Sequence, residues 1–184
     1  PANRSMPYLS PFMDQFMKYA VVRDETGTFD TLSIDPENPG PYADRISELS
    51  KQLDTSTDIS KFVARGGKLL LAHGLQDVLV STRATEWYWE KLQDQFGPRH
   101  VGKFARFYEV PGAGHALGAA FTPGWDSLTA LENWVEKGIA PKNQIVTDTA
   151  VHAGRTRPLC PYPTWPKYNG GDQNLASSFT CSNY

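Results

Sequence analysis

The sequence predicts an α/β fold in which parallel strands are flanked by helices, and three stretches of the chain carry this prediction. Residues 67–77 form a short apolar run that ends at a glycine and an aspartate. Residues 82–96 place apolar side chains at helical spacing, and residues 104–110 form a second apolar run of strand length. Strand, helix and strand in this order make a βαβ unit, whose strands are parallel and whose crossover is right-handed.

The N-terminal third of the chain is predicted to be mainly helical. A short helix is expected after Pro11, with an aromatic stripe that is interpreted as core packing or, alternatively, as lining for an acyl pocket: Phe12, Phe16 and Tyr19. Residues 29–41 are expected to be a loop or a single short strand, because glycine and proline close the segment. Residues 42–53 are predicted to form an amphipathic helix with these residues inward: Ile46, Leu49 and Leu53.

Capping and breaking residues define the elements in the middle of the chain. A turn of helix is expected from Ser60 toward Arg65, and the glycine pair 66–67 ends it. Ser81 is the expected N-cap of the helix over residues 82–96, which Gly97 and the following proline end.

The segment after residue 124 is predicted to contain a helix, a strand and an irregular tail. Residues 125–137 have helical spacing and end at Gly138, and residues 145–151 resemble a strand. The expected domain organisation is 1–153 for the main α/β part and 154–184 for a Pro/Gly-rich tail of the same domain. A disulfide between Cys160 and Cys181 is expected to clamp this tail and to contribute about 3 kcal/mol, with two free buried thiols as the alternative.

Asp77 and His115 are the candidate catalytic residues. Each follows a predicted strand, so both are expected at the carboxyl edge of the parallel sheet. There the carboxylate would accept the Nδ1 proton of the imidazole, and Nε2 would take a proton from a nucleophile. The alternatives are that Asp77 is an ordinary turn residue and that His115 is a buried histidine with satisfied hydrogen bonds.

The nucleophile of such a site is not found in this sequence. No Gly-x-Ser-x-Gly motif occurs, and in α/β-hydrolases the serine precedes the acid and the base along the chain. We therefore expect this polypeptide to be the C-terminal portion of an α/β-hydrolase, with the nucleophile on a preceding segment or on a separate chain.

Composition excludes several other classes of function and indicates an extracellular location. The net charge of −2 and the pI near 6.1 argue against a nucleic-acid partner and an anionic membrane surface. No apolar run approaches the roughly 20 residues that span a bilayer. The cysteine pair predicts a secreted protein, for which Asn3, in the triplet Asn-Arg-Ser, is a candidate glycosylation site. The histidines and cysteines have no zinc spacing, so no metal site is predicted.

Five motifs, in the same order and spacing, resemble the C-terminal part of the tannase/feruloyl esterase family of secreted serine esterases. They are Thr57-Asp58 with Phe62-Val63-Ala64-Arg65-Gly66-Gly67-Lys68-Leu69-Leu70, His73-Gly74 followed by Asp77, Val110-Pro111-Gly112-Ala113-Gly114-His115, residues 131–141 (LENWVEKGIAP) and residues 156–163 (TRPLCPYP). The resemblance covers most of the chain from residue 57 onward.

This resemblance implies an α/β-hydrolase that cleaves aromatic esters of phenolic acids such as gallate or ferulate. It implies that Asp77 and His115 are the acid and base of a triad, and that the serine lies before a large lid that precedes this segment. It also implies that calcium binds in that lid and that this chain itself holds no cofactor.

One position departs from the family pattern. Most members have a cysteine directly after the catalytic histidine, bridged to a cysteine beside the serine, whereas this chain has Ala116. Together with the missing serine, Ala116 supports the alternative of a non-catalytic, hydrolase-derived binding or structural subunit. The other histidines are assigned no chemistry: His73 is expected to bond a backbone carbonyl, His100 to be solvated, and His152 has no partner in sequence.

Overall fold

The computed structural model describes residues 9–115 and 119–183. The chain divides into two compact units, residues 1–56 and residues 57–184. Asn3 and Ala116, on which two of the sequence predictions depend, lie outside the described residues.

The first unit consists of helical segments, as predicted. α1 (Ser10–Gln15) has a proline in its first turn and continues as the π-helix η1 (Phe16–Val22), which ends where Arg23 adopts a left-handed backbone with φ of 60°. Two short 3₁₀ turns follow in the expected loop, η2 (Thr31–Ser33) and η3 (Gly40–Tyr42). The unit's last element is α2 (Ala43–Leu53).

Burial in the first unit differs from the sequence prediction in the last turn of α2 and in the aromatic stripe of α1 and η1. Leu49 of α2 is buried, and Arg45 Nε donates a hydrogen bond of 3.1 Å to the carbonyl of Ala20. Leu53, predicted to face inward, is 66% exposed, because the helix ends there and leaves its last turn uncovered. The stripe predicted to pack in a core is likewise exposed to a large extent: Phe12, Phe16 and Tyr19.

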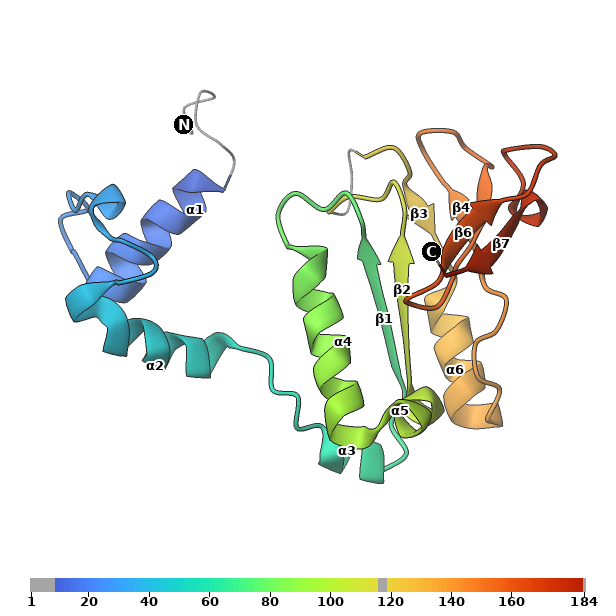
Figure 1. Ribbon diagram of the computed structural model, residues 1–184, viewed down its shortest axis with the longest axis horizontal. Helices are drawn as coiled ribbons and strands as arrows, with labels where there is room; N and C mark the ends of the chain where they lie inside the picture. Colours follow the sequence, from blue (N-terminus) through green and yellow to red (C-terminus); the bar gives the residue numbers. More distant parts are fainter. Residues whose placement is uncertain (1–8, 116–118, 184) are drawn as a thin grey trace. The chain divides into compact units, whose positions relative to one another are not determined.

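The second unit is built on the predicted parallel strand pair (Figure 1). α3 (Ser60–Ala64) leads into β1 (Leu69–Gly74), which pairs in parallel with β2 (Ala105–Val110). The register runs from Leu69 opposite Ala105 to Gly74 opposite Val110, so both strands end at the same level. Four of the six residues of β2 are buried and apolar, and the two charged residues, Arg106 and Glu109, occupy its partly buried positions.

The crossover between the two strands contains two helices. α4 (Thr82–Phe96) has the predicted bounds, although the side chain of Ser81 makes no capping hydrogen bond. Directly after Gly97, α5 (Pro98–Phe104) begins, a helix that the sequence analysis did not predict. The proline that stops α4 is also favourable in the first turn of a new helix, because that turn needs no donor from it.

Helices cover both faces of the strand pair (Figure 1). On the α4 face, one apolar cluster joins the crossover to β2: Trp89, Leu92, Val101, Phe104, Ala105 and Phe107. On the other face, α6 (Ser127–Lys137) buries Trp134, whose ring centroid lies 4.8 Å from the guanidinium of Arg106. α6 ends at Gly138 in the left-handed conformation, as predicted for a glycine at this position.

The C-terminal part of the chain forms two small antiparallel sheets. β3 (Pro123–Gly124), β4 (Ile145–Asp148) and β5 (Thr156–Pro158) form the first sheet, and β6 (Trp165–Tyr168) and β7 (Phe179–Ser182) form the second. The short 3₁₀ turn η4 (Ala176–Ser178) precedes β7. The predicted disulfide between Cys160 and Cys181 is present. The tail is therefore clamped as expected, but it is more regular than its composition indicated.

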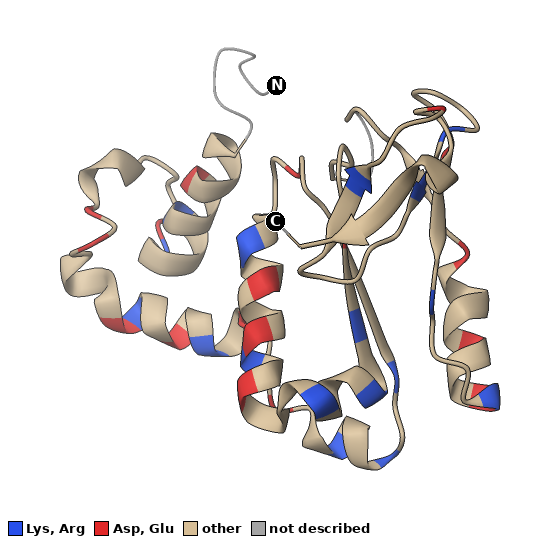
Figure 2. Ribbon diagram, turned by 45° about the vertical axis from the view of Figure 1, so that its right-hand side comes forward, with Lys and Arg blue, Asp and Glu red and all other residues tan. Residues whose placement is uncertain are grey.

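Charged side chains of both signs are interspersed on the long helices. Figure 2 shows both acidic and basic residues along α2 and α4. Within the described ranges, no helix is both long and apolar enough to cross a bilayer.

Candidate functional site

The candidate site lies where β1 and β2 end. Asp77 follows β1 after a tight turn, and His115 follows β2 after the turn formed by residues 111–114. Because Gly74 and Val110 are register partners, the two turns leave the sheet side by side. Gly112 in the second turn has φ of +82°, a conformation that glycine adopts without strain.

The structure brings the two predicted side chains into direct contact. Asp77 Oδ2 lies 2.8 Å from Nδ1 of His115. The other carboxylate oxygen, Oδ1, accepts hydrogen bonds from the backbone N–H groups of Leu79 at 2.8 Å and Val80 at 2.9 Å. The carboxylate is thus oriented by its own turn, and it can accept the Nδ1 proton of the imidazole.

The hydrogen bonds to Asp77 favour its ionised form. Burial opposes ionisation, but the N–H groups of Val80 and Leu79 and the imidazole of His115 outweigh it and hold the pKa of Asp77 well below its usual range. Asp77 therefore carries a negative charge throughout the neutral pH range. A permanent charge at this position stabilises an imidazolium at His115.

The side chain of Asp77 is buried, whereas that of His115 is partly exposed, as a base that receives a proton from another group must be. The side chain of Asp77 is 6% exposed, whereas that of His115 is 48% exposed. Within residues 9–115 and 119–183, Nε2 of His115 has no hydrogen-bond partner. This nitrogen is accordingly open to a group from outside the described residues, while Nδ1 is held by the acid.

Close packing of the two turns fixes the distance between acid and base. The N–H of Gln76 donates to the carbonyl of Ala113 at 2.8 Å, and the N–H of Leu75 donates to Val110 at 3.2 Å. A Cβ atom on Gly74 would lie 2.4 Å from the oxygen of Ala113, so no larger residue fits there without displacing the backbone. Ala113 itself is buried.

His73 is a further member of the site that sequence reasoning placed only in part. Its Nε2 lies 3.2 Å from the carbonyl of Val80, the kind of backbone contact that was predicted. The same nitrogen lies 3.3 Å from Oδ2 of Asp77, and Nδ1 lies 2.7 Å from the hydroxyl of Thr85. With a proton on Nε2, His73 satisfies these contacts and supports the turn from Asp77 to Val80.

The remaining candidates lie elsewhere. The Cys160–Cys181 disulfide belongs to the C-terminal sheets. His100 is exposed, as expected, although its ring also contacts Phe96 and Phe104. Among the side chains that the structure describes, no group of three His, Cys, Asp or Glu could hold a metal ion.

Two parallel strands that deliver an acid and a base to one edge are the arrangement found in α/β-hydrolases, and the match to solved structures agrees. The fold resembles the crystal structure of feruloyl esterase B from Aspergillus oryzae, with a TM-score of 0.78 at 23% sequence identity. That match covers 92% of this chain and 37% of the other.

The sequence itself identifies the family. The family profile described as "Tannase and feruloyl esterase" matches residues 3–182, so the chain belongs to the tannase and feruloyl esterase family, a family of carboxylic ester hydrolases.

Two curated relatives share 43% identity with the chain. An uncharacterized esterase of Agrobacterium fabrum matches in an alignment of 172 residues that covers 91% of this chain and 31% of the relative. The mono(2-hydroxyethyl) terephthalate hydrolase of Piscinibacter sakaiensis matches in an alignment of 134 residues that covers 70% of this chain and 22% of the relative. The chain thus spans less than a third of the length of these two relatives.

Proposed function

We propose that this chain supplies the acid, Asp77, and the base, His115, of a secreted serine carboxylesterase that hydrolyses aromatic esters of phenolic acids such as gallate or ferulate. The serine nucleophile and the lid belong to a preceding segment or to a separate chain. The observation that carries the proposal is the 2.8 Å contact between a buried carboxylate and the Nδ1 atom of a half-exposed imidazole.

In the proposed mechanism, Nε2 of His115 takes the hydroxyl proton as the serine oxygen attacks the ester carbonyl. Asp77 accepts the Nδ1 proton in a hydrogen bond and stabilises the imidazolium, and it stays ionised itself. The imidazolium then gives its proton to the leaving alcohol, and an acyl-serine remains. Water, deprotonated by His115, attacks the acyl group, and the carboxylic acid is released with the serine regenerated.

The comparisons support the chemical class of the substrate. Family membership favours ester hydrolysis, and one relative is named for a terephthalate ester, which is an aromatic ester. The disulfide supports secretion, because such bonds persist in oxidising compartments. Calcium, which the resemblance assigns to the lid, is assigned to no residue of this chain.

The proposal is tested in the complete esterase with the variant His115→Ala. We expect turnover of a ferulate or gallate ester to fall by about 1,000-fold or more, because no other group takes the serine proton. His152→Ala is the matched control, since His152 is exposed and only its backbone N–H bonds to Asp148. Activity of His115→Ala within tenfold of wild type would exclude the base role.

A fluorophosphonate probe separates the esterase from a non-catalytic hydrolase relic. The probe reacts with an activated serine, so we expect it to label the segment or polypeptide that accompanies this chain. The same labelling should be strongly reduced in His115→Ala. Native protein that is not labelled would instead support the binding or structural subunit.

A further inference from the structure

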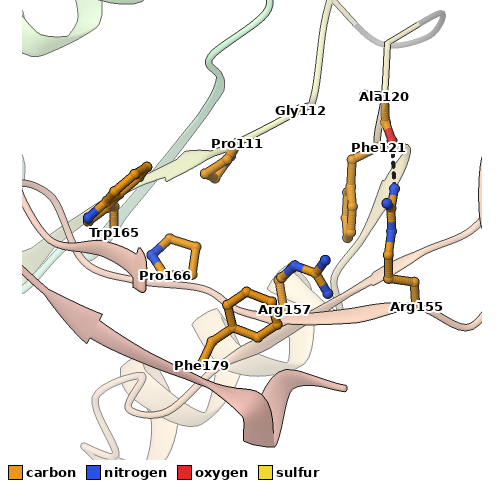
Figure 3. Close-up of a pocket in the computed structure, with 9 residues that line it drawn as sticks. All are labelled: Pro111, Gly112, Ala120, Phe121, Arg155, Arg157, Trp165, Pro166 and Phe179. Atoms are coloured by element: carbon orange, nitrogen blue, oxygen red, sulfur yellow. Dashed lines mark hydrogen bonds between the residues drawn. The ribbon is translucent and has the colours of Figure 1, made fainter. Parts of the chain in front are cut away.

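A pocket lies beside the turn that precedes His115, and Pro111 and Gly112 of that turn contribute to its lining. It has a volume of about 260 Å³, and residues of four segments surround it: Gly112 of the turn, Arg157 of β5, Trp165 of β6 and Phe179 of β7. Figure 3 shows the side chains of Arg157, Trp165 and Phe179, with Phe121, around one space. Neither Asp77 nor His115 lines it, so the proposed esterase mechanism does not use this pocket.

Two guanidinium groups line the pocket, and the charge of the first is compensated within the protein. Nη2 of Arg155 lies 2.7 Å from Oδ2 of the buried Asp148 and donates to the carbonyl of Ala120 at 2.6 Å, the bond drawn in Figure 3. The same guanidinium lies 5.1 Å from the ring centroid of Phe121. Arg155 is thus part of the structure around Asp148 and not a free cation.

Arg157 is in a different situation. Its guanidinium lies 4.2 Å from the ring centroid of Phe179, and Nη1 donates at 2.7 Å to the carbonyl of Thr156. In the part of the chain that the structure describes, no carboxylate lies within ion-pair distance of Arg157. A half-buried guanidinium with five N–H donors is ordinarily paired with an anion, so this pocket lacks a negative charge.

The electrostatic surroundings of Arg157 also indicate that its positive charge is not compensated. Burial and the positive charge of Arg155 both lower the pKa of Arg157. The charge of an anion in the pocket would act in the opposite direction and raise this pKa. A carboxylate suits this position, because its two oxygens match the planar fork of a guanidinium.

The walls of the pocket specify the rest of the ligand. Phe121, Trp165 and Phe179 line the pocket with aromatic surface, and flat aromatic groups pack favourably on such rings. We propose that this pocket binds a small aromatic carboxylate, whose carboxylate pairs with Arg157 and whose ring packs against the aromatic walls.

The proposal is tested by calorimetric titration of the full-length protein with benzoate and with benzamide, its uncharged counterpart. We expect benzoate to bind with a Kd in about the millimolar range or tighter, and benzamide to bind about tenfold more weakly or worse. This comparison needs no variant, so it does not depend on how a mutant folds. The titration measures binding alone, so it does not require esterase activity.

Variants assign the binding to this pocket. Arg157→Gln should weaken benzoate binding about tenfold or more, while Arg65→Gln, which removes an exposed arginine elsewhere, should leave it unchanged. His115→Ala should also leave it unchanged, which distinguishes the pocket from the candidate catalytic site. A melting curve for each variant verifies the fold.

Three results would overturn the proposal. Benzoate that does not bind at all would mean that another part of the protein already compensates Arg157. Benzoate and benzamide of equal affinity, or equal binding by wild type and Arg157→Gln, would remove the role of the carboxylate. Acetate that binds as tightly as benzoate would remove the role of the aromatic walls.

Discussion

Replacing Asp77 by asparagine tests the acid role without disturbing the turn that holds it. The asparagine carbonyl can still accept the hydrogen bonds that Oδ1 takes from Leu79 and Val80, at 2.8 and 2.9 Å. Its NH₂ group, however, would replace Oδ2 at 2.8 Å from Nδ1 of His115. An N–H donor there favours the imidazole with its proton on Nε2, and that tautomer cannot accept a proton from serine.

The structure therefore predicts a large effect on turnover and a small one on folding. We expect kcat of the complete esterase to fall by about 10³- to 10⁴-fold at neutral pH, because both the tautomer and the charge that stabilises the imidazolium are lost. The hydrolysis of a ferulate ester can be followed by absorbance, and a melting curve measures Tm in parallel. Tm should fall by at most a few degrees, because the backbone hydrogen bonds to Oδ1 remain while the contact of Oδ2 with Nε2 of His73, at 3.3 Å, is lost.

Asp126→Asn is the matched control for this change. Asp126 is an exposed carboxyl that also accepts a backbone hydrogen bond, from the N–H of Thr129, as the N-cap of α6. Asparagine is an equally good N-cap, so neither activity nor Tm should change. If Asp77→Asn keeps more than a tenth of the wild-type kcat, Asp77 does not orient the base.

Three further predictions concern stability. Asp148→Asn should lower Tm by at least about 5 °C with kcat unchanged, because its NH₂ group would face the guanidinium of Arg155 in a buried site. Burial and Glu86 raise the pKa of Glu109 to about 7, so its contribution to stability is present at low pH and is lost as the pH rises through 7. Glu109→Gln should therefore be more stable than wild type above about pH 7, by roughly 1–2 kcal/mol after allowance for solvent screening, and the difference should vanish near pH 4. Replacing Cys160 and Cys181 by serine should cost about 3 kcal/mol, since their bridge closes a loop with a sequence separation of 21 residues.

Each stability prediction has its own check. Melting curves at several pH values measure the Glu109 effect, and parallel wild-type and variant curves would contradict it. An Asp148→Asn variant that melts with wild type would mean that the ion pair adds no stability. For the disulfide, chemical unfolding with and without reductant gives the difference, and a reduced protein as stable as the oxidised one would refute the loop argument.

The strand pair and the acid–base contact could be predicted because they depend on local signals. The bounds of α4 follow from apolar periodicity between Ser81 and Gly97. Asp77 and His115 each follow a strand of one βαβ unit, and parallel pairing then brings them to the same edge. The contact between Asp77 and His115 could thus be predicted from the order of the secondary-structure elements alone.

The features that the sequence did not reveal depend on contacts between distant residues. In the sheet, Thr156 of β5 pairs with Thr147 of β4. No local sequence pattern predicts this strand pairing in a segment rich in proline. Pro166 lies within β6, which is possible because that sheet has just two strands. The contact from His73 to Asp77 exists because the turn folds back toward the strand, so residue types alone could not disclose it.

The absence of a side chain at Gly74 has a consequence for how this family can change its substrates. Since the backbones around Gly74 and Ala113 touch, the spacing of the proton-transfer pair is an internal property of this segment. It does not have to be rebuilt when the segments that contact the ester vary. Under the proposed function, one acid–base pair would therefore serve esters with different acyl groups, and substrate range would change in other parts of the protein.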